Sequence, residues 1–269
     1  MNSNEARNLF YRHATAMAYV EVELPKGDKS IGSAFHIGDG VFVTARHVVA
    51  GNTIIQIRIT ESLPLSTKEY FQKMFGANVS DEYIKEYEES GGPILTNPPS
   101  FTHWEKPLEL AIEPIFHEDE RVDLAIFKVK ELHEKVQTVI LGIHMNDLAF
   151  RGLWHLSEAI VLGYPPIPMA TEPHLVAAKA EIHTYITTYH SPHVHFILSS
   201  MPRGGFSGGV AIHESGSALG VITSSFGVNN QPEQLGFFAV LSVAPIIDCL
   251  KKTDLVPRVQ KLVRKHYLE

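Results

Sequence analysis

Residues 203–212, RGGFSGGVAI, place a single serine, Ser207, among four glycines. Glycine allows backbone conformations that are closed to other residues, and it lets a second molecule approach the chain closely. A serine nucleophile needs both properties, because backbone N–H groups must point at a developing oxyanion while the flanking chain leaves room for a carbonyl group. The segment therefore predicts a nucleophilic Ser207, with a glycine-rich hairpin turn as the alternative.

Two further residues have the chemistry that would activate such a serine. His47 follows an apolar strand in FVTARHVVAG, and imidazole titrates near neutral pH, so it can take the serine proton and return it. Asp123 opens the apolar segment DLAIFKV, where its carboxylate can accept the other imidazole N–H and fix the tautomer. The alternatives are a structural histidine and a surface or strand-capping aspartate. The three residues occur in the chymotrypsin order His, Asp, Ser, which favours the catalytic interpretation.

Composition narrows the class of protein. The chain has 269 residues, of which 44% are hydrophobic and 20% charged, as expected for a soluble globular protein. Its net charge of −7 argues against a nucleic-acid binder and against a polybasic membrane surface. Cys249 is the only cysteine, so no internal disulfide can form. With no 18-residue apolar stretch and no apolar run typical of a signal peptide, we expect a cytoplasmic protein.

The elements that must position these residues are mainly short strands. Segments rich in Val, Ile and Phe recur about every ten residues between turn signals, a pattern typical of a sandwich or barrel. Strands are expected at 18–24, 32–37, 40–44, 53–59, 108–116 and 123–129, and again at 159–163, 175–189, 194–198, 209–213, 218–225 and 236–239. Helices are expected at 5–18, 242–251 and 257–266, and a helical insertion at 61–107. Thus His47 and Asp123 fall in the first β block and Ser207 in the second, and a cleft between the blocks would bring them together.

Four motifs resemble the signature blocks of bacterial trypsin-like serine peptidases of the Deg/HtrA type. They are GSAFHIGDGVFVTARHVV at 32–49, DLAIFKV at 123–129, VLGYP at 161–165 and GGFSGGVAI at 204–212. The resemblance covers most of residues 18–241 and implies an all-β fold of two six-stranded antiparallel β-barrels, chymotrypsin-like, with a helical insertion and C-terminal helices. The N-terminal barrel would span 1–135 with the insertion, and the C-terminal barrel 136–269 with the helices.

The same resemblance implies roles for individual residues. His47 would be the general base, Asp123 would orient it, and Ser207 would attack the substrate carbonyl. The backbone N–H groups of Gly205 and Ser207 would form the oxyanion hole. The primary substrate pocket would be lined by Met201, Thr223, Ser224 and Ser225, and it contains no acid, which favours a small or medium apolar side chain over Lys or Arg.

Two departures from the family are informative. Phe206 stands where the digestive branch has an acid that pairs with a newly cleaved N-terminus, so activation by N-terminal trimming is not expected. Only 28 residues follow residue 241, too few for a PDZ-like domain. A compact peptidase of this kind would be controlled by a partner protein or used against one substrate.

The favoured function is a serine endopeptidase that acts on proteins or peptides through an acyl-enzyme and needs no cofactor. The alternatives are an inactive trypsin-like fold that serves as a binding module, and an esterase-type acyl hydrolase. In HSPHVHF, His193 and His195 have a spacing that can bind zinc, but no further ligand is evident and a polar strand edge or loop is favoured, so no metal is expected. The aromatic residues of 61–107 would form a small satellite core with a solvated acidic face; the alternative is that this segment covers the cleft or docks a partner. Cys249 would be a buried hydrophobe.

Overall fold

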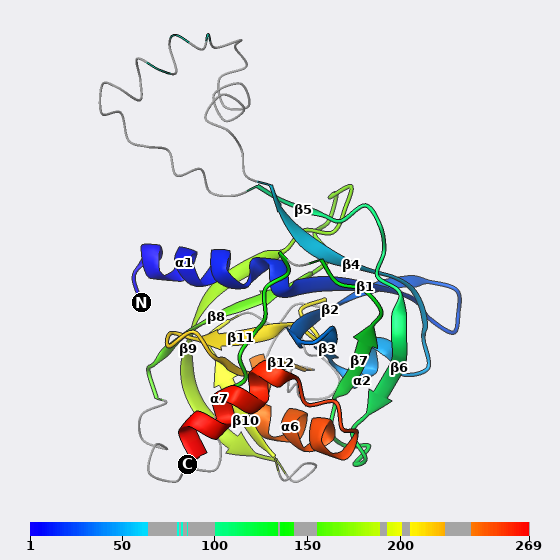
Figure 1. Ribbon diagram of the computed structural model, residues 1–269, viewed down its shortest axis with the longest axis vertical. Helices are drawn as coiled ribbons and strands as arrows, with labels where there is room; N and C mark the ends of the chain where they lie inside the picture. Colours follow the sequence, from blue (N-terminus) through cyan, green and yellow to red (C-terminus); the bar gives the residue numbers. More distant parts are fainter. Residues whose placement is uncertain are drawn as a thin grey trace.

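The computed structural model describes residues 1–63, 80, 82, 85, 100–133, 135–142, 155–188, 193–200, 205–223 and 238–268. The N-terminal half forms a seven-stranded antiparallel sheet in the order β5-β4-β1-β2-β3-β7-β6 (Figure 1). Its strands are β1 (Met17–Glu23), β2 (Lys29–Gly38), β3 (Val41–Thr44), β4 (Thr53–Leu63), β5 (Ser100–His103), β6 (Leu110–Phe116) and β7 (Ala125–Val129).

The C-terminal half forms a closed six-stranded barrel in the order β10-β13-β12-β11-β8-β9. Its strands are β8 (Glu158–Gly163), β9 (Val176–Thr187), β10 (Val194–Leu198), β11 (Val210–His213), β12 (Ala218–Ile222) and β13 (Phe238–Ser242). Strands β12 and β13 are buried along their whole length, and β8 and β11 at all but one residue, because closure leaves their residues facing either the barrel interior or a neighbouring element.

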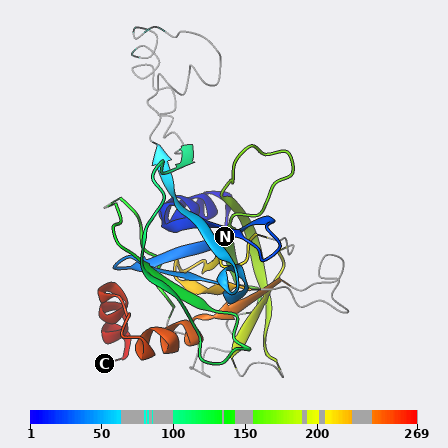
Figure 2. The ribbon, with the colours of Figure 1, turned by 90° about the vertical axis from the view of Figure 1, so that its right-hand side faces the viewer.

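Helices flank the two β units. α1 (Ser3–His13) starts with an Asn2–Glu5 capping box and continues into the 3-10 turn η1 (Ala14–Ala16). The one-turn helix α2 (Arg46–Val49) follows β3. α6 (Val243–Lys252) and α7 (Arg258–Leu268) lie together on one side of the molecule, orange to red in Figure 2.

Gln260 of α7 ties three segments together with a buried amide. Its Nε2 donates hydrogen bonds of 2.8 Å to the carbonyl oxygens of Ile37 and Val139, and its Oε1 accepts one of 3.1 Å from the N–H of Leu141. Ile37 belongs to β2, whereas Val139 and Leu141 belong to the segment between β7 and β8. The amide therefore fixes α7 and this connecting segment against the N-terminal sheet.

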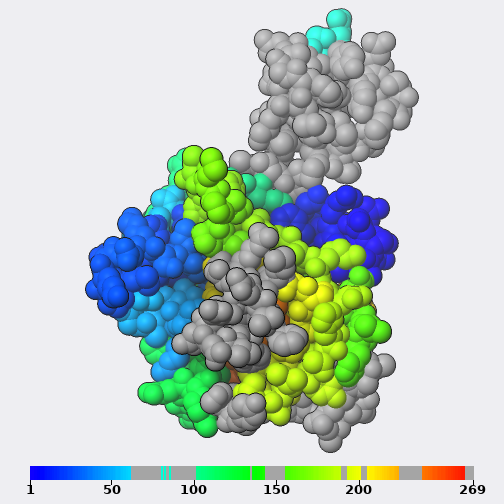
Figure 3. Space-filling view, turned by 180° about the vertical axis from the view of Figure 1, so that it is seen from behind, coloured from blue at the N-terminus to red at the C-terminus, as the bar shows by residue number. Residues whose placement is uncertain are grey.

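One apolar cluster joins the two β units. It combines Met17, Phe35 and Val43 of the N-terminal sheet with Leu162 and Val210 of the C-terminal barrel, all almost fully buried. Figure 3 shows the sheet, blue to green, beside the barrel, yellow-green, from behind. Burial of apolar surface favours this contact by roughly 25 cal/mol per Å², so the shared core fixes the two units relative to each other.

The predicted all-β fold of two chymotrypsin-like units with C-terminal helices is confirmed. The N-terminal unit differs from the predicted six-stranded barrel, since its described strands form a seven-stranded sheet with β5 and β6 at its edges. Strand β5 and the end of β4 lie inside the segment 61–107 that was predicted as a helical insertion, because their backbones pair from Thr60↔His103 to Leu63↔Ser100. Of residues 64–99 only 80, 82 and 85 are described, so most of the predicted insertion lies outside the described residues. The predicted boundary between 135 and 136 falls in the segment between β7 and β8.

No helix in the described ranges has the length and apolar character needed to cross a membrane.

Candidate active site

The pairing of β3 with β7 brings His47 and Asp123 together. Thr44 and Ala125 are register partners, His47 lies just after the first of these residues, and Asp123 lies just before the second. Asp123 Oδ1 accepts a hydrogen bond of 2.9 Å from the His47 backbone N–H, and its Oδ2 lies 2.7 Å from the His47 Nδ1. The carboxylate thus holds the residue by both backbone and ring. The His47 side chain is 44% exposed, so Nε2 can be reached from solvent.

Ser33 of β2 holds the loop that carries Ser207. The Ser33 backbone N–H donates to the Ser207 carbonyl oxygen at 2.8 Å, and the Ser33 hydroxyl donates to the Gly205 carbonyl oxygen at 2.6 Å. The same hydroxyl accepts a hydrogen bond of 2.8 Å from the Tyr164 N–H. Ser33 is fully buried, so these bonds form away from water and fix the loop of the barrel on the N-terminal sheet.

Gly208 lies directly against the chain that leads to His47. A Cβ at this position would be 2.0 Å from the Ser33 carbonyl oxygen, 2.4 Å from the Thr44 Oγ1 and 3.1 Å from the Ala45 nitrogen. Its φ of +83° is in the region that favours glycine. Ser207 therefore adjoins a residue packed on Ala45, which is two positions before His47. The structure brings the three predicted segments together across the junction of the two units.

The predicted oxyanion donors, the backbone N–H groups of Gly205 and Ser207, lie in a tightly packed loop. Gly205 has a φ of +86°, and a Cβ there would lie 2.5 Å from the Tyr164 carbonyl oxygen. Among the described residues, no acceptor takes a hydrogen bond from the N–H of Gly205 or of Ser207. Two N–H groups with one residue between them are thus without an acceptor among the described residues, which is what the predicted oxyanion hole requires.

Phe206 packs into the core of the C-terminal barrel. Its side chain is 4% exposed and meets the Phe238 ring edge-on at a centroid distance of 6.0 Å. An acid in this apolar position would need a buried partner, because an unpaired buried charge is strongly unfavourable. The position is thus occupied by an apolar side chain anchored in the core.

Of the predicted substrate-pocket residues, only Thr223 is described, and it is buried with 8% of its surface exposed. Its N–H donates a weak hydrogen bond of 3.4 Å to the Ala239 carbonyl oxygen. Met201, Ser224 and Ser225 lie outside the described residues. The pocket and its apolar preference remain predictions.

The prediction of a polar strand edge or loop at His193–His195 is wrong for His195. Strand β10 pairs with β9 on one side and β13 on the other, and His195 is 7% exposed. Burial lowers the pKa of His195, and the nearby Asp123 opposes this shift. The His193 ring meets His117 of the N-terminal half edge-on at 5.5 Å. In the part of the chain that is described, no three His, Cys, Asp or Glu side chains form a group that could hold a metal ion.

Two positioning residues were missed by the sequence analysis. Ser33 and Thr44 are fully buried polar residues inside the apolar strands β2 and β3, and the Thr44 Oγ1 donates to the Ser33 carbonyl oxygen at 2.7 Å. A buried hydroxyl needs a partner, so a lone serine or threonine within such a strand was the available signal. One other prediction is confirmed: Cys249 is buried, and burial raises its pKa.

Residues 32–221 match the model of the trypsin-like peptidase domain. The chain belongs to this family. The match spans all three predicted catalytic residues of the peptidase and identifies it as a serine protease of trypsin type. No curated protein matches its sequence.

Solved structures show the same fold for this peptidase. The active form of the Rv3671c protease from M. tuberculosis superimposes with a TM-score of 0.59 at 16% identity, over 94% of this chain and 86% of the other. The HtrA-type protease AlgW with a tripeptide gives 0.56 at 16% identity, over 93% of this chain and 63% of the other. Deg5 gives 0.52 at 14% identity, over 92% and 94%.

Proposed function

We propose that this peptidase is a serine endopeptidase in which His47, Asp123 and Ser207 form the catalytic triad. The observation that carries the proposal is the double contact of the Asp123 carboxylate with the backbone and ring of His47. With Nδ1–H donated to the carboxylate, Nε2 is the free acceptor that a general base requires. The packing of Gly208 on Ala45 supports the inclusion of Ser207.

The proposed reaction begins with transfer of the Ser207 hydroxyl proton to His47 Nε2 as Oγ attacks the scissile carbonyl carbon. Asp123 stabilises the imidazolium that forms and keeps the ring oriented. The carbonyl oxygen becomes an oxyanion, which the N–H groups of Gly205 and Ser207 bind. Each such donor is typically worth a factor of about 10²–10³ in rate.

Collapse of the tetrahedral intermediate breaks the peptide C–N bond, and His47 gives its proton to the leaving amine. The acyl group remains on Ser207. A water molecule then attacks the ester with His47 again as base, which releases the acid product and restores the serine hydroxyl. Every step uses side chains and backbone groups of this chain.

Labelling with a fluorophosphonate probe tests the triad. We expect the wild-type protein to be labelled at Ser207 and to cleave an unfolded protein, and Ser207→Ala to do neither. Labelling without cleavage of any protein or peptide would favour an esterase instead. No labelling of a folded wild-type protein would contradict a competent triad and favour the binding module.

Three parts of this proposal rest on the sequence alone: that the peptidase is controlled by a partner protein, that it is bacterial, and that it is cytoplasmic. Purification from the native cell with the Ser207→Ala variant as bait would capture both substrates and a regulator. A protein that binds wild type and Ser207→Ala equally and changes the labelling rate would be a regulator. A protein cleaved by wild type alone would be a substrate.

A further inference from the structure

A cavity of about 500 Å³ lies where α1, the N-terminal sheet and the segment between the two β units meet. Its lining residues come from four separate parts of the chain: Tyr11, Arg12 and Thr15; Thr60 and Glu61; Trp104; and Lys135, Val136 and Gln137. The volume is within the range of roughly 300–1,000 Å³ that is typical of small-molecule sites. None of the proposed catalytic residues lines the cavity.

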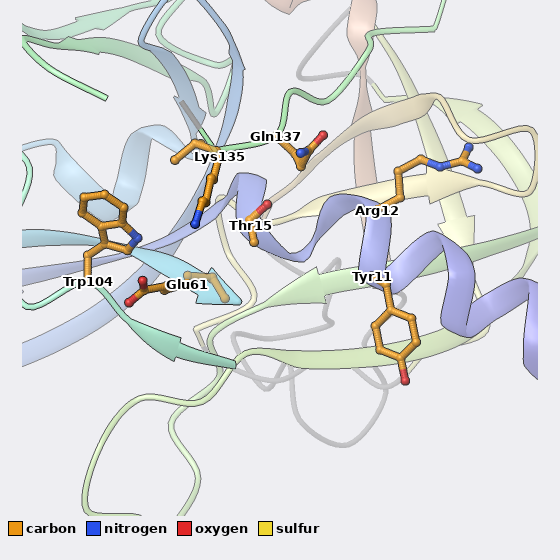
Figure 4. Close-up of a pocket in the computed structure, with 9 residues that line it drawn as sticks. Tyr11, Arg12, Thr15, Glu61, Trp104, Lys135 and Gln137 are labelled. Carbon is orange, nitrogen blue, oxygen red and sulfur yellow. The ribbon is translucent and has the colours of Figure 1, made fainter. Parts of the chain in front are cut away.

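Glu61 and Lys135 line the same cavity. Glu61 and Lys135 carry opposite charges, yet among the described residues neither takes part in a salt bridge. Figure 4 shows Glu61, Lys135, Trp104 and Thr15 around one part of the cavity. The Arg12 guanidinium and the Tyr11 hydroxyl point away from that group. One cation and one anion are therefore presented together, and neither has a salt-bridge partner in the part of the chain that the structure describes.

Thr15 supplies an unsatisfied buried hydroxyl at the cavity. It is only 9% exposed, and among the described residues its Oγ1 has no hydrogen-bond partner. A buried hydroxyl left without a partner costs about 1–3 kcal/mol. By contrast, the neighbouring Thr60 is satisfied, since its Oγ1 donates to the Met17 carbonyl oxygen at 2.8 Å. A ligand atom at Thr15 would remove the penalty.

An aromatic surface completes the cavity. Trp104 is packed on one side by the His133 ring, at a centroid distance of 4.4 Å and near a right angle, and the indole also lines the cavity. The indole Nε1–H of Trp104 has no acceptor among the described residues. The ring and Val136 offer apolar contact, whereas the indole N–H and the Thr15 hydroxyl offer hydrogen bonds to a polar backbone.

We propose that this cavity binds a zwitterionic short peptide of two or three residues. Its free ammonium group pairs with Glu61, its carboxylate pairs with Lys135, and the amide between them bonds to Thr15 or Trp104. Both charges of the ligand are then neutralised, which a phosphate or a simple cation could not achieve with this pair. The site goes beyond the proposed peptidase function and does not depend on catalysis.

Calorimetric titration of the full chain with the dipeptide alanylleucine tests the proposal. The Ser207→Ala variant serves as the common background, so that turnover cannot contribute. We expect saturable binding of one dipeptide, which Glu61→Gln and Lys135→Gln each weaken about tenfold, as for loss of a hydrogen bond to a charged group. Glu109→Gln and Lys130→Gln, an exposed pair outside the cavity, are matched controls that leave the affinity unchanged.

Capped peptides separate the two charge contacts without relying on the fold of a variant. N-acetyl-alanylleucine lacks the ammonium group, so Glu61→Gln should not lower the affinity for this peptide any further. Alanylleucine amide lacks the carboxylate, so Lys135→Gln should not lower the affinity for this peptide any further. Equal loss for free and capped peptides would overturn the assignment. So would the absence of saturable binding, or saturation of the site by inorganic phosphate alone. Loss of peptidase activity in Ser207→Ala has no bearing on these outcomes.

Discussion

Replacing Gly208 by alanine tests whether the nucleophile loop must lie directly against the His47 segment. The new Cβ would be 2.0 Å from the Ser33 carbonyl oxygen, whereas real Cβ atoms essentially never come closer than 3.0 Å. The loop must therefore retreat by about 1 Å. A left-handed conformation adds about 1–2 kcal/mol for an L-residue. Since a displacement of about 1 Å can cost roughly 10²-fold in rate, we expect kcat/KM to fall by about that factor.

Gly27 provides the matched control for this substitution. Its φ of +87° is close to the +83° of Gly208, but a Cβ there would meet no atom within 4 Å. Gly27→Ala should therefore lose about 1–2 kcal/mol of stability from the backbone alone and keep its activity. Urea unfolding gives the stability of both variants, and the rates of fluorophosphonate labelling and of peptide hydrolysis give the activity. A folded Gly208→Ala variant with the activity of Gly27→Ala would refute the inferred contact.

Three further outcomes follow from the site and from the buried groups. Asp123→Asn should keep the fold and lower kcat by about 10⁴-fold, because the amide selects the wrong tautomer of His47; steady-state kinetics with a thermal melt checks this. Ser33→Ala should cost about 1–3 kcal/mol and lower kcat more than it raises KM, since it frees the Gly205 carbonyl oxygen; unchanged kcat would contradict its positioning role. Burial lowers the pKa of His13 to about 4 from 6.5, so the folded state binds this proton less well. The free energy of unfolding therefore has its full value above pH 6.5 and falls progressively, by about 3 kcal/mol in all, as the pH falls to about 4 and His13 is protonated in the unfolded chain. Measured by urea unfolding across this range, the free energies of unfolding of wild type and His13→Gln should diverge by that amount.

The sequence by itself predicted most of the strands and helices and supplied the candidates for catalytic residues. Strands alternate or fill with apolar residues because each strand is buried on one face or both, and this pattern is local. The glycines around Ser207 are also a local signal, because a position whose backbone conformation is closed to other residues is occupied by glycine. The imidazole of His47 and the carboxylate of Asp123 could be proposed from their positions beside apolar strands.

The tertiary structure alone decided which atoms meet. Ser33 and Gly205 are 172 residues apart in the chain, and no local pattern links a strand serine to the carbonyl oxygen of a distant loop. The burial of His195 was missed because it depends on β10 having a neighbour on both sides, which only closure of the barrel provides. The cavity beside Thr15 has walls from four separate segments, so it exists only once they pack. Residue types reflect local steric and solvation demands, whereas these contacts depend on strand pairings between residues far apart in the chain.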